Sequence, residues 1–347
     1  ANILNAANAV ISHNPDRIGK QLWTDSGEGE PVDVYAAYNE MDEARFVVER
    51  IRQWVREGGS WSEAAVLYRS NAQSRALEEV LLAEQVPYRV YGGMRFFERA
   101  EIKDTLAYLR LVANRADDAA FERTVNTPVR GIGDRTLDEV RRRAREHGVS
   151  LWQAASALVA ENALAARARN AVAGFLSLIE ALDAETTDLA LKDRVDHVLA
   201  RSRLREHWSS EARGQLDAES RLENLDELVS VASRFSRAEL DEDQQSMSEL
   251  VAFLSYAALE AGEGQAQADE DGVQLMTLHS AKGLEFPLVL LVGVEEGVFP
   301  SSKSLEESGR LEEERRLAYV GITRARHKLV LTWAESRRIH GMDMYGM

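Results

Sequence analysis

A polar loop between two apolar runs is the first candidate for chemistry in this sequence. The segment Met276-Thr-Leu-His-Ser-Ala-Lys-Gly-Leu-Glu-Phe-Pro287 leaves a predicted strand with Thr277, His279 and Lys282 and turns at Gly283. Open α/β sheets bind ligands beyond the ends of their strands, and loop amides, hydroxyls and cations bind phosphates and nucleic-acid backbones. The loop is therefore a candidate site for a phosphate or a nucleic-acid strand. An ordinary polar loop with a core-facing His279 accounts for the same residue types equally well.

Arg324 is the second candidate, because it follows a predicted helix (about 311–323) and precedes a predicted strand (328–333). An arginine at such a junction can reach a phosphate held by another domain, as an arginine finger does. Arginines beside a glutamate run more often form surface ion pairs, as Arg315 and Arg316 can here. For Arg324 the residue types leave both interpretations open.

A third polar segment, Val66-Leu-Tyr-Arg-Ser-Asn-Ala-Gln-Ser-Arg75, also follows a predicted strand. The side chains of Arg69 and Asn71 are good donors to phosphates and base edges. A serine or asparagine in front of a helix also serves as an N-cap without any ligand. The residue types alone favour the cap.

The most basic stretch of the chain surrounds Gly131-Ile132-Gly133, between two predicted helices. Arg135 and the arginines of 141–145 follow these glycines, and Thr136 is the expected cap of the second helix. Glycines permit close backbone approach, and a helix N-terminus offers free N–H groups to a phosphate. Because helix-hairpin-helix elements grip DNA in this way, the stretch predicts duplex binding. A plain turn with a solvated arginine face is the alternative.

Composition narrows the function classes. The net charge of −16 argues against indiscriminate adhesion to nucleic acid or membranes, while leaving room for a local basic surface. The absence of cysteine excludes disulfides and thiolate metal sites, and no histidine spacing suggests a metal site. No apolar run is long enough to cross a bilayer, and no Gly-x-x-x-x-Gly-Lys-Ser/Thr segment is present to cradle phosphates.

The elements that must position these residues alternate at both ends of the chain. Strands are predicted at 33–38, 64–68, 88–91, 273–277, 288–293 and 328–333, and helices at 44–55 and 73–84. Residues 96–259 are predicted to be almost entirely helical, and an acidic linker follows at 261–272. This order predicts an α/β fold: a parallel sheet with helices on both faces and an all-α block inserted between its third and fourth strands.

Four segments in this order resemble the C-terminal half of superfamily-one DNA helicases of the UvrD, PcrA and Rep group. They are Tyr68-Arg-Ser-Asn-Ala-Gln-Ser-Arg75, Tyr91-Gly-Gly-Met-Arg-Phe-Phe97, Thr277-Leu-His-Ser-Ala-Lys-Gly-Leu-Glu-Phe286 and Ala318-Tyr-Val-Gly-Ile-Thr-Arg-Ala325. The resemblance covers essentially all of the chain. It implies a RecA-like domain 2A formed by residues 1–93 and 266–347, with a large helical domain 2B at 94–265 inserted in it.

The resemblance also implies roles for individual residues. Arg324 matches the arginine finger that contacts the γ-phosphate, and Gly283 and Glu285 belong to the nucleotide site, with Glu285 bonding the ribose. The residues implied to contact DNA are Arg69, Asn71, Thr277 and His279 for the single strand, Gly131, Ile132, Gly133 and Arg135 for the duplex, and His340 for strand separation. At position 340 the family has a larger aromatic residue.

The implied activity is that of an ATP-dependent 3′→5′ DNA helicase in DNA repair, acting on single-stranded DNA and single-strand/duplex junctions. ATP and Mg²⁺ would be held mainly by a first RecA-like domain outside this chain, and a family Asn-Tyr-Arg-Ser-Thr segment would lie just before Ala1. The chain alone is then expected to be inactive. Mismatch-repair and excision-repair proteins are the expected partners, no membrane is involved, and the expected location is the bacterial cytoplasm at the nucleoid. The alternative is a non-catalytic module that binds DNA or a protein partner.

Overall fold

A computed structural model describes residues 1–14, 22–25, 27–91, 93–236, 247–262, 271–306, 309–339 and 342–345. The chain forms two compact units. The first comprises Ala1–Phe96 and Gly264–Met347, and the second comprises Phe97–Glu263.

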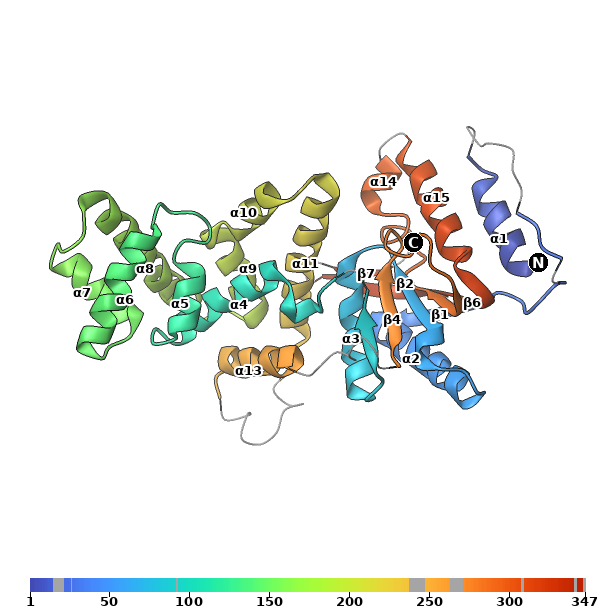
Figure 1. Ribbon diagram of the computed structural model, residues 1–347, viewed down its shortest axis with the longest axis horizontal. Coiled ribbons are helices and arrows are strands. Elements are labelled where there is room, and N and C mark those ends of the chain that lie inside the picture. The colour runs from blue at the N-terminus through green and yellow to red at the C-terminus, as the bar shows by residue number, and fades with distance from the viewer. Residues whose placement is uncertain are drawn as a thin grey trace. The chain divides into compact units, whose positions relative to one another are not determined.

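The described strands of the first unit form one sheet (Figure 1). They are β1 (Asp33–Asn39), β2 (Ala64–Tyr68), β3 (Tyr88–Val90), β4 (Val273–Thr277), β5 (Phe286–Leu291), β6 (Ala325–Ile339) and β7 (Met342–Tyr345). Their order is β1-β6-β5-β2-β4-β3, all parallel, with β7 antiparallel beside β6. Parallel sheets are covered on both faces, which explains why β2 is entirely buried and apolar.

Helices cover both faces of this sheet, as Figure 1 shows. The helices of the first unit are α1 (Asn2–Ile11), α2 (Glu40–Arg56), α3 (Ser74–Ala83), α14 (Ser302–Glu306) and α15 (Arg310–Ile322), with short 3-10 turns η1 (Trp61–Glu63), η2 (Asn71–Gln73) and η3 (Phe96–Glu98). Ile51 of α2 and Leu81 of α3 pack on one face. Ala7 of α1 and Leu317 of α15 pack on the other.

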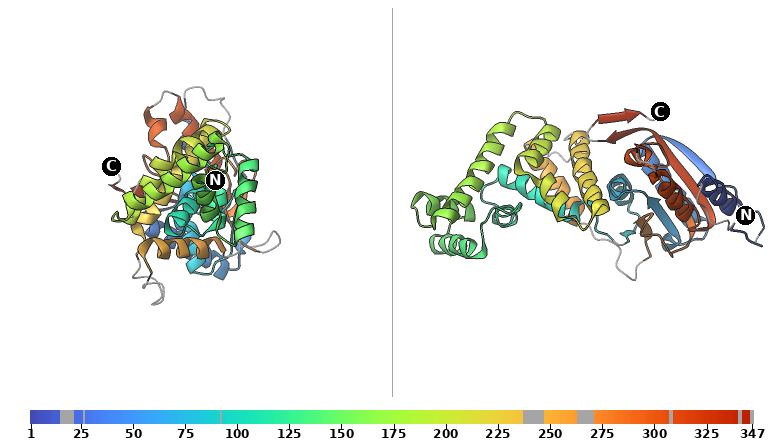
Figure 2. Two further views of the ribbon diagram at one scale, coloured as in Figure 1. Left: turned by 90° about the vertical axis from the view of Figure 1, so that its left-hand side faces the viewer. Right: turned by 90° about the horizontal axis from the view of Figure 1, so that it is seen from above.

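Local sequence signals set the helix boundaries. The Asn39 side chain accepts hydrogen bonds from the backbone N–H groups of Met41 (3.1 Å) and Asp42 (2.9 Å), so it caps the first turn of α2. The left-handed Gly58 follows the end of that helix. Strand β6 continues well beyond the predicted 328–333, because it pairs with β1 as far as Ser336 and then, from Ser336 to Ile339, with β7 (Figure 2).

The second unit is helical throughout its described residues. Its helices are α4 (Ala100–Ala113), α5 (Asp118–Thr124), α6 (Asp134–His147), α7 (Leu151–Ala160), α8 (Ala166–Thr186), α9 (Leu191–Ser202), α10 (Leu204–Glu211), α11 (Gln215–Arg234) and α13 (Glu249–Gly262). Phe121 and Phe175 meet edge to face in its core, with ring centroids 5.6 Å apart. Helix α6 begins at Asp134 with Gly133 as N-cap, so the prediction that Thr136 caps it is wrong.

The predicted fold class is confirmed: a parallel-sheet α/β domain carries an all-α block between its third and fourth strands. Among the described helices, none is both long and apolar enough to cross a membrane.

Gly321 of α15 tests how tightly this helix packs on the loop after β4. A Cβ atom at Gly321 would lie 2.5 Å from Leu278 Cδ2, so Gly321→Ala should lower the free energy of unfolding by about 1–3 kcal/mol. Gly174 of α8 is the matched control, because a Cβ there meets nothing within 4 Å. Gly174→Ala should instead stabilise by about 0.5–1 kcal/mol. Denaturant unfolding of both variants measures the difference, and equal effects would contradict the close packing.

Candidate functional site

The carboxyl ends of β2 and β4 bring two predicted segments together. Tyr68 pairs with Thr277 at the end of the two strands, and the Leu278 N–H donates to the Tyr68 carbonyl at 2.8 Å. Arg69 therefore begins its loop beside the loop that carries His279. Two segments that lie far apart in the chain form one surface because parallel strands end at the same sheet edge.

Arg69 is held by a carboxylate from α15. Its Nε donates to Glu314 Oε1 (3.0 Å) and Oε2 (3.1 Å), and its Nη2 donates to Oε1 (2.9 Å). The Arg69 side chain is 18% exposed and that of Glu314 is 5% exposed. Gln73 Oε1 accepts from the backbone N–H groups of Arg69 and Ser70, both at 2.9 Å, which fixes the start of the loop.

Asn71 opens the 3-10 turn η2 and is partly exposed. The cap of this turn is Ser70, in a capping box with Gln73. The N-cap that the sequence offered as the alternative role of this segment is therefore Ser70, and Asn71 is not needed as a cap.

The loop after β4 is folded by its own threonine. The Ser280 N–H donates to Thr277 Oγ1 (3.2 Å), and the Ala281 N–H donates to the Thr277 carbonyl (3.1 Å). Leu278 and Ala281 are buried in the core, whereas His279 is exposed to solvent. The alternative of a core-facing His279 is therefore wrong, because Leu278 occupies that place.

Partial burial and the nearby positive charge of Arg69 lower the pKa of His279, and the Glu314 carboxylate offsets part of this effect. The ring is therefore neutral at physiological pH. A neutral imidazole can stack on a base or exchange one hydrogen bond, but it adds no positive charge to the surface.

Arg324, Glu285 and Gly283 lie at the opposite edge of the sheet. Phe286 and Ala325 pair at the starts of β5 and β6, and the preceding residues project from this amino edge. The segment between β4 and β5 must therefore cross one face of the sheet, and its Leu278, Ala281 and Leu284 join the same core cluster as α15. The sequence has Thr277, His279, Gly283 and Glu285 in one segment, and the structure divides this segment between the two edges.

The Arg324 guanidinium is fixed by neutral acceptors. Its Nε donates to the Val320 carbonyl (3.0 Å), Nη1 to the Leu284 carbonyl (2.8 Å) and Nη2 to Thr323 Oγ1 (3.1 Å). Within the described chain it forms no ion pair, so its charge is not neutralised. The surface ion-pair alternative instead describes Arg316, which pairs with Glu313 at 2.9 Å.

Glu285 and Gly283 flank the residue that receives the Arg324 side chain. The Phe286 N–H donates to the Arg324 carbonyl at 2.9 Å, so Glu285 lies between two segments bonded to Arg324. Its side chain is exposed and makes no hydrogen bond or ion pair with the described residues. Gly283 has φ +89° and open space where a Cβ would lie. A guanidinium bonded only to neutral acceptors among the described residues suits a phosphate, an exposed carboxylate suits a sugar hydroxyl, and a glycine suits close backbone approach.

The Gly131–Gly133 hairpin of the helical unit is built around Asn126. Asn126 Oδ1 accepts from the backbone N–H groups of Arg130 (2.8 Å) and Ile132 (3.2 Å). Gly131 adopts φ +79°, and Ile132 is 1% exposed. Ile132 therefore anchors the hairpin from inside and offers DNA neither its side chain nor its N–H, whereas both glycines are exposed.

Most arginines of this stretch are already paired. Arg130 points inward and donates to the carbonyls of Thr124 (2.9 Å) and Pro128 (3.0 Å). The ion pairs of the next helix join Arg141 to Glu122 and Asp138, Arg142 to Glu146, and Arg143 to Glu161. Arg135, whose side chain is 95% exposed, has only a 3.9 Å contact with Glu139. The predicted arginine face is thus neutralised at Arg141, Arg142 and Arg143, whereas Arg135 and the exposed Arg145 form no close ion pair with the described residues.

His340 lies outside the described residues. Just before it, Arg337 is held between two carboxylates that the sequence had not linked to it. Arg337 donates to Glu295 Oε1 and Oε2 and to Glu43 Oε2, and the Gly293 N–H donates to Glu43 Oε1 at 2.9 Å. Glu295 therefore serves an ion pair with Arg337, next to the segment of β6 that pairs with β7.

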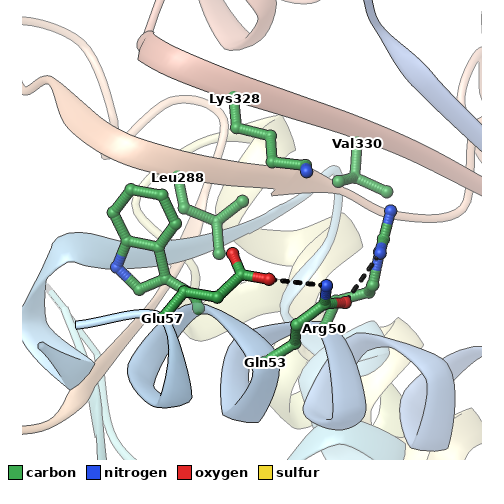
Figure 3. Close-up of a pocket in the computed structure, with 7 residues that line it drawn as sticks. Arg50, Gln53, Glu57, Leu288, Lys328 and Val330 are labelled. Atoms are coloured by element: carbon green, nitrogen blue, oxygen red, sulfur yellow. Dashed lines mark hydrogen bonds between the residues drawn. The ribbon is translucent and has the colours of Figure 1, made fainter. Parts of the chain in front are cut away.

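A small pocket between α2 and the strands β5 and β6 contains none of the predicted site residues (Figure 3). Arg50 donates to Gln53 (2.8 Å) and Gln53 donates to Glu57 (2.8 Å), so the polar groups of this pocket bond one another. The candidate site is therefore the pair of sheet edges and not this depression.

Sequence comparison agrees with the architecture and with the segments at both edges. The profile of the "UvrD-like helicase C-terminal domain" family matches residues 1–336. The chain belongs to this UvrD-like helicase family. It is 60% identical to DNA helicase II of Escherichia coli over 99% of its length, and 56% identical to DNA helicase II of Haemophilus influenzae. It is 44% identical to the ATP-dependent DNA helicase PcrA of Bacillus subtilis.

The UvrD-like chain spans about half the length of the curated relatives it matches: 47% of the Escherichia coli protein and 46% of the other two. The resemblance inferred from the four sequence segments is confirmed, including its restriction to one half of the relatives.

The lowered pKa of His279 gives this UvrD-like domain a measurable pH dependence. As the pH falls, His279 binds a proton in the unfolded chain before it does so in the folded domain. Its contribution to the free energy of unfolding is therefore lost as the pH drops from about 6.5, the usual histidine pKa, toward the lower pKa of the folded state. We expect Arg69→Gln to raise the pKa of His279 by removing a nearby positive charge. NMR titration of the imidazole measures the pKa of His279. Arg316→Gln is the control and should leave this pKa unchanged. An unshifted His279 in Arg69→Gln would contradict the electrostatic assignment.

Proposed function

We propose that this chain is the second motor domain (2A, residues 1–93 and 266–347) and the duplex-binding insert (2B, 94–265) of an ATP-dependent 3′→5′ DNA helicase. The observation that carries the proposal is Arg324: its guanidinium has no counter-ion among the described residues, and neutral acceptors fix it near the exposed Glu285 carboxylate. Arg324 is partly buried, and holding a cation there against neutral acceptors has a cost that an incoming phosphate would offset.

ATP is the substrate at the amino edge. Arg324 donates to the γ-phosphate and stabilises the charge that develops during its transfer, while Glu285 accepts from a ribose hydroxyl. Gly283 lets the backbone come close to the nucleotide. This chain contains no Gly-x-x-x-x-Gly-Lys-Ser/Thr segment. The phosphate cradle and Mg²⁺ therefore belong to the half of the protein outside this chain.

Single-stranded DNA binds at the carboxyl edge. Arg69 contacts a phosphate, Asn71 and His279 contact the backbone or a base, and Thr277 shapes the loop that presents His279. The two edges are opposite ends of one sheet, joined by α15 and by the crossing segment after β4. A domain built in this way can respond at one edge to occupancy of the other.

The helical insert binds the duplex through the exposed glycines Gly131 and Gly133 and the Arg135 side chain, with Ile132 as the internal support of the hairpin. His340 contacts the base pair at the junction where the strands part. The relatives are DNA helicases of bacteria, which supports a role on DNA in a bacterial cytoplasm. We propose the nucleoid as the location and mismatch-repair and excision-repair proteins as the partners.

The alternative is a non-catalytic binding module. For the chain taken alone, the lack of a phosphate cradle favours this alternative. Such a module would bind DNA in a full-length protein that does not hydrolyse ATP.

Replacing Arg324 tests the ATP assignment. In the full-length protein, Arg324→Ala should lower DNA-stimulated ATP turnover about 10³-fold or more, because a lost arginine finger leaves transition-state charge unstabilised. Arg326→Ala is the matched control, since Arg326 is exposed and two residues further along. Steady-state ATPase assays with saturating single-stranded DNA give both numbers. Unchanged turnover in Arg324→Ala would remove the finger assignment, and no turnover in the wild type would favour the binding module.

Salt dependence tests the hairpin of the helical insert. Each phosphate contact to duplex DNA contributes about 0.9 to the slope of log affinity against log salt concentration. Arg135→Gln should therefore reduce this slope by about 0.9 for a single-strand/duplex junction. Arg142→Gln is the control and should reduce it less, because Glu146 already pairs with Arg142. Fluorescence anisotropy across a salt series measures both, and an unchanged slope in Arg135→Gln would exclude this contact.

A further inference from the structure

Helix α15 carries a functional charge at each of its ends. Glu314 lies in its second turn and pairs with Arg69 at the carboxyl edge. Arg324 follows its last residue, Ile322, at the amino edge. Since an α-helix rises about 1.5 Å per residue, the backbone from Glu314 to Ile322, two residues before Arg324, spans about 12 Å of one rigid element.

The Glu314–Arg69 contact leaves the outer edge of the guanidinium available. Glu314 accepts from Nε (3.0 Å) and Nη2 (2.9 Å), and Ser304 Oγ donates to Glu314 at 3.2 Å, which holds the carboxylate from a second side. Nη1 of Arg69 makes no hydrogen bond with the residues that the structure describes. A guanidinium gripped along one edge in this way presents its other donors in a fixed direction.

The same helix is tied to the His279 loop by close packing. Gly321 has no room for a Cβ against Leu278, and the Leu278 N–H bonds the Tyr68 carbonyl, one residue before Arg69. The end of β2, the loop after β4 and α15 are thus in direct contact. Packed interfaces of this kind shift between discrete arrangements instead of deforming gradually.

The burial of Glu314 is the feature that calls for an explanation. A carboxylate that is 5% exposed loses most of its hydration, and a buried ion pair is often no more stabilising than apolar residues of the same volume. Stability alone therefore does not explain why a glutamate occupies this position. Its geometry is specific to orienting Arg69 and to linking that arginine with α15.

We propose that Glu314 is a positioning residue that couples DNA-strand binding at Arg69 to the placement of Arg324 through α15; this inference rests on the proposed helicase function. Glu314 aims the free donors of Arg69 at a DNA phosphate. When the strand draws Arg69, the bidentate ion pair transmits the displacement to α15, and the far end of the helix carries Arg324 toward the nucleotide. Both sites then bias the position of a single helix.

The test is Glu314→Gln in the full-length protein, with a polythymidine oligonucleotide as the DNA. The ratio of ATP turnover with saturating DNA to turnover without DNA should fall about fivefold or more, the usual lower range of coupling between sites. The affinity for the oligonucleotide should fall by less than it does in Arg69→Gln, because Arg69 keeps its charge and a nearby negative charge is gone, although its donors are less well aimed. A merely structural loss would weaken both quantities.

Two variants provide the comparison. Arg69→Gln should weaken oligonucleotide binding and reduce the salt slope by about 0.7, the contribution of one phosphate contact to a single strand. Glu313→Gln removes the same charge one position away, from a side chain that is 58% exposed and pairs with Arg316 instead. It should keep the stimulation ratio within about twofold of wild type, an energy difference of about 0.4 kcal/mol.

A stable fold is verified by thermal unfolding of each variant. If Glu314→Gln does not fold because Arg69 is left uncompensated, the double variant Arg69→Gln/Glu314→Gln carries the test, since it leaves no buried charge unpaired. It should show a reduced stimulation ratio even at saturating DNA.

A stimulation ratio close to wild type in the folded Glu314 variant, or in the double variant, overturns the coupling role. So does a loss of oligonucleotide affinity equal to that of Arg69→Gln, because Glu314 would then act only on binding. If the wild type shows no DNA-stimulated ATP turnover, or if Arg324→Ala is without effect, the proposed function itself fails and this inference fails with it. The Arg324 result thus separates the two.

Discussion

Parallel pairing of β6, β5, β2 and β4 is the constraint on which the rest of the first unit depends. It places every strand start at one edge and every strand end at the other. Residues that follow a strand, such as Arg69, therefore gather at one edge, and residues that precede a strand, such as Arg324, gather at the opposite one. Each connection must cross a face of the sheet, which is how α15 and the segment after β4 come to link the two edges.

The sequence predicted the local elements well because their signals are local. Buried parallel strands appear as short apolar runs, and β2 and β4 have the predicted bounds. The candidate residues were also singled out from local patterns, but those patterns did not predict which of these residues lie together in the fold. The ion pair between Arg69 and Glu314 joins positions 245 residues apart, and three consecutive glutamates gave no indication of which one is buried. Tertiary packing makes that choice, since only one helix face meets the sheet.

Charge is the property for which the sequence was least informative. Helix α6 contains five arginines and four carboxylates. The arginines make this stretch look basic, but its net charge is close to zero. Its arginines bond carboxylates on the same helix and on neighbouring segments, which no count of residue types reveals. At Arg324 the opposite holds: a glutamate run precedes it in the chain, yet only neutral acceptors reach it.

The place of the helical insert has a topological consequence. It leaves after β3 at the carboxyl edge and returns before β4 at the amino edge, and these two strands are parallel neighbours. The entire second unit therefore occupies the position of the crossover connection in a β-α-β unit. A shortened chain without it could not be closed by a tight turn. It would need a replacement connection of about a dozen residues that passes over the sheet in the right-handed sense.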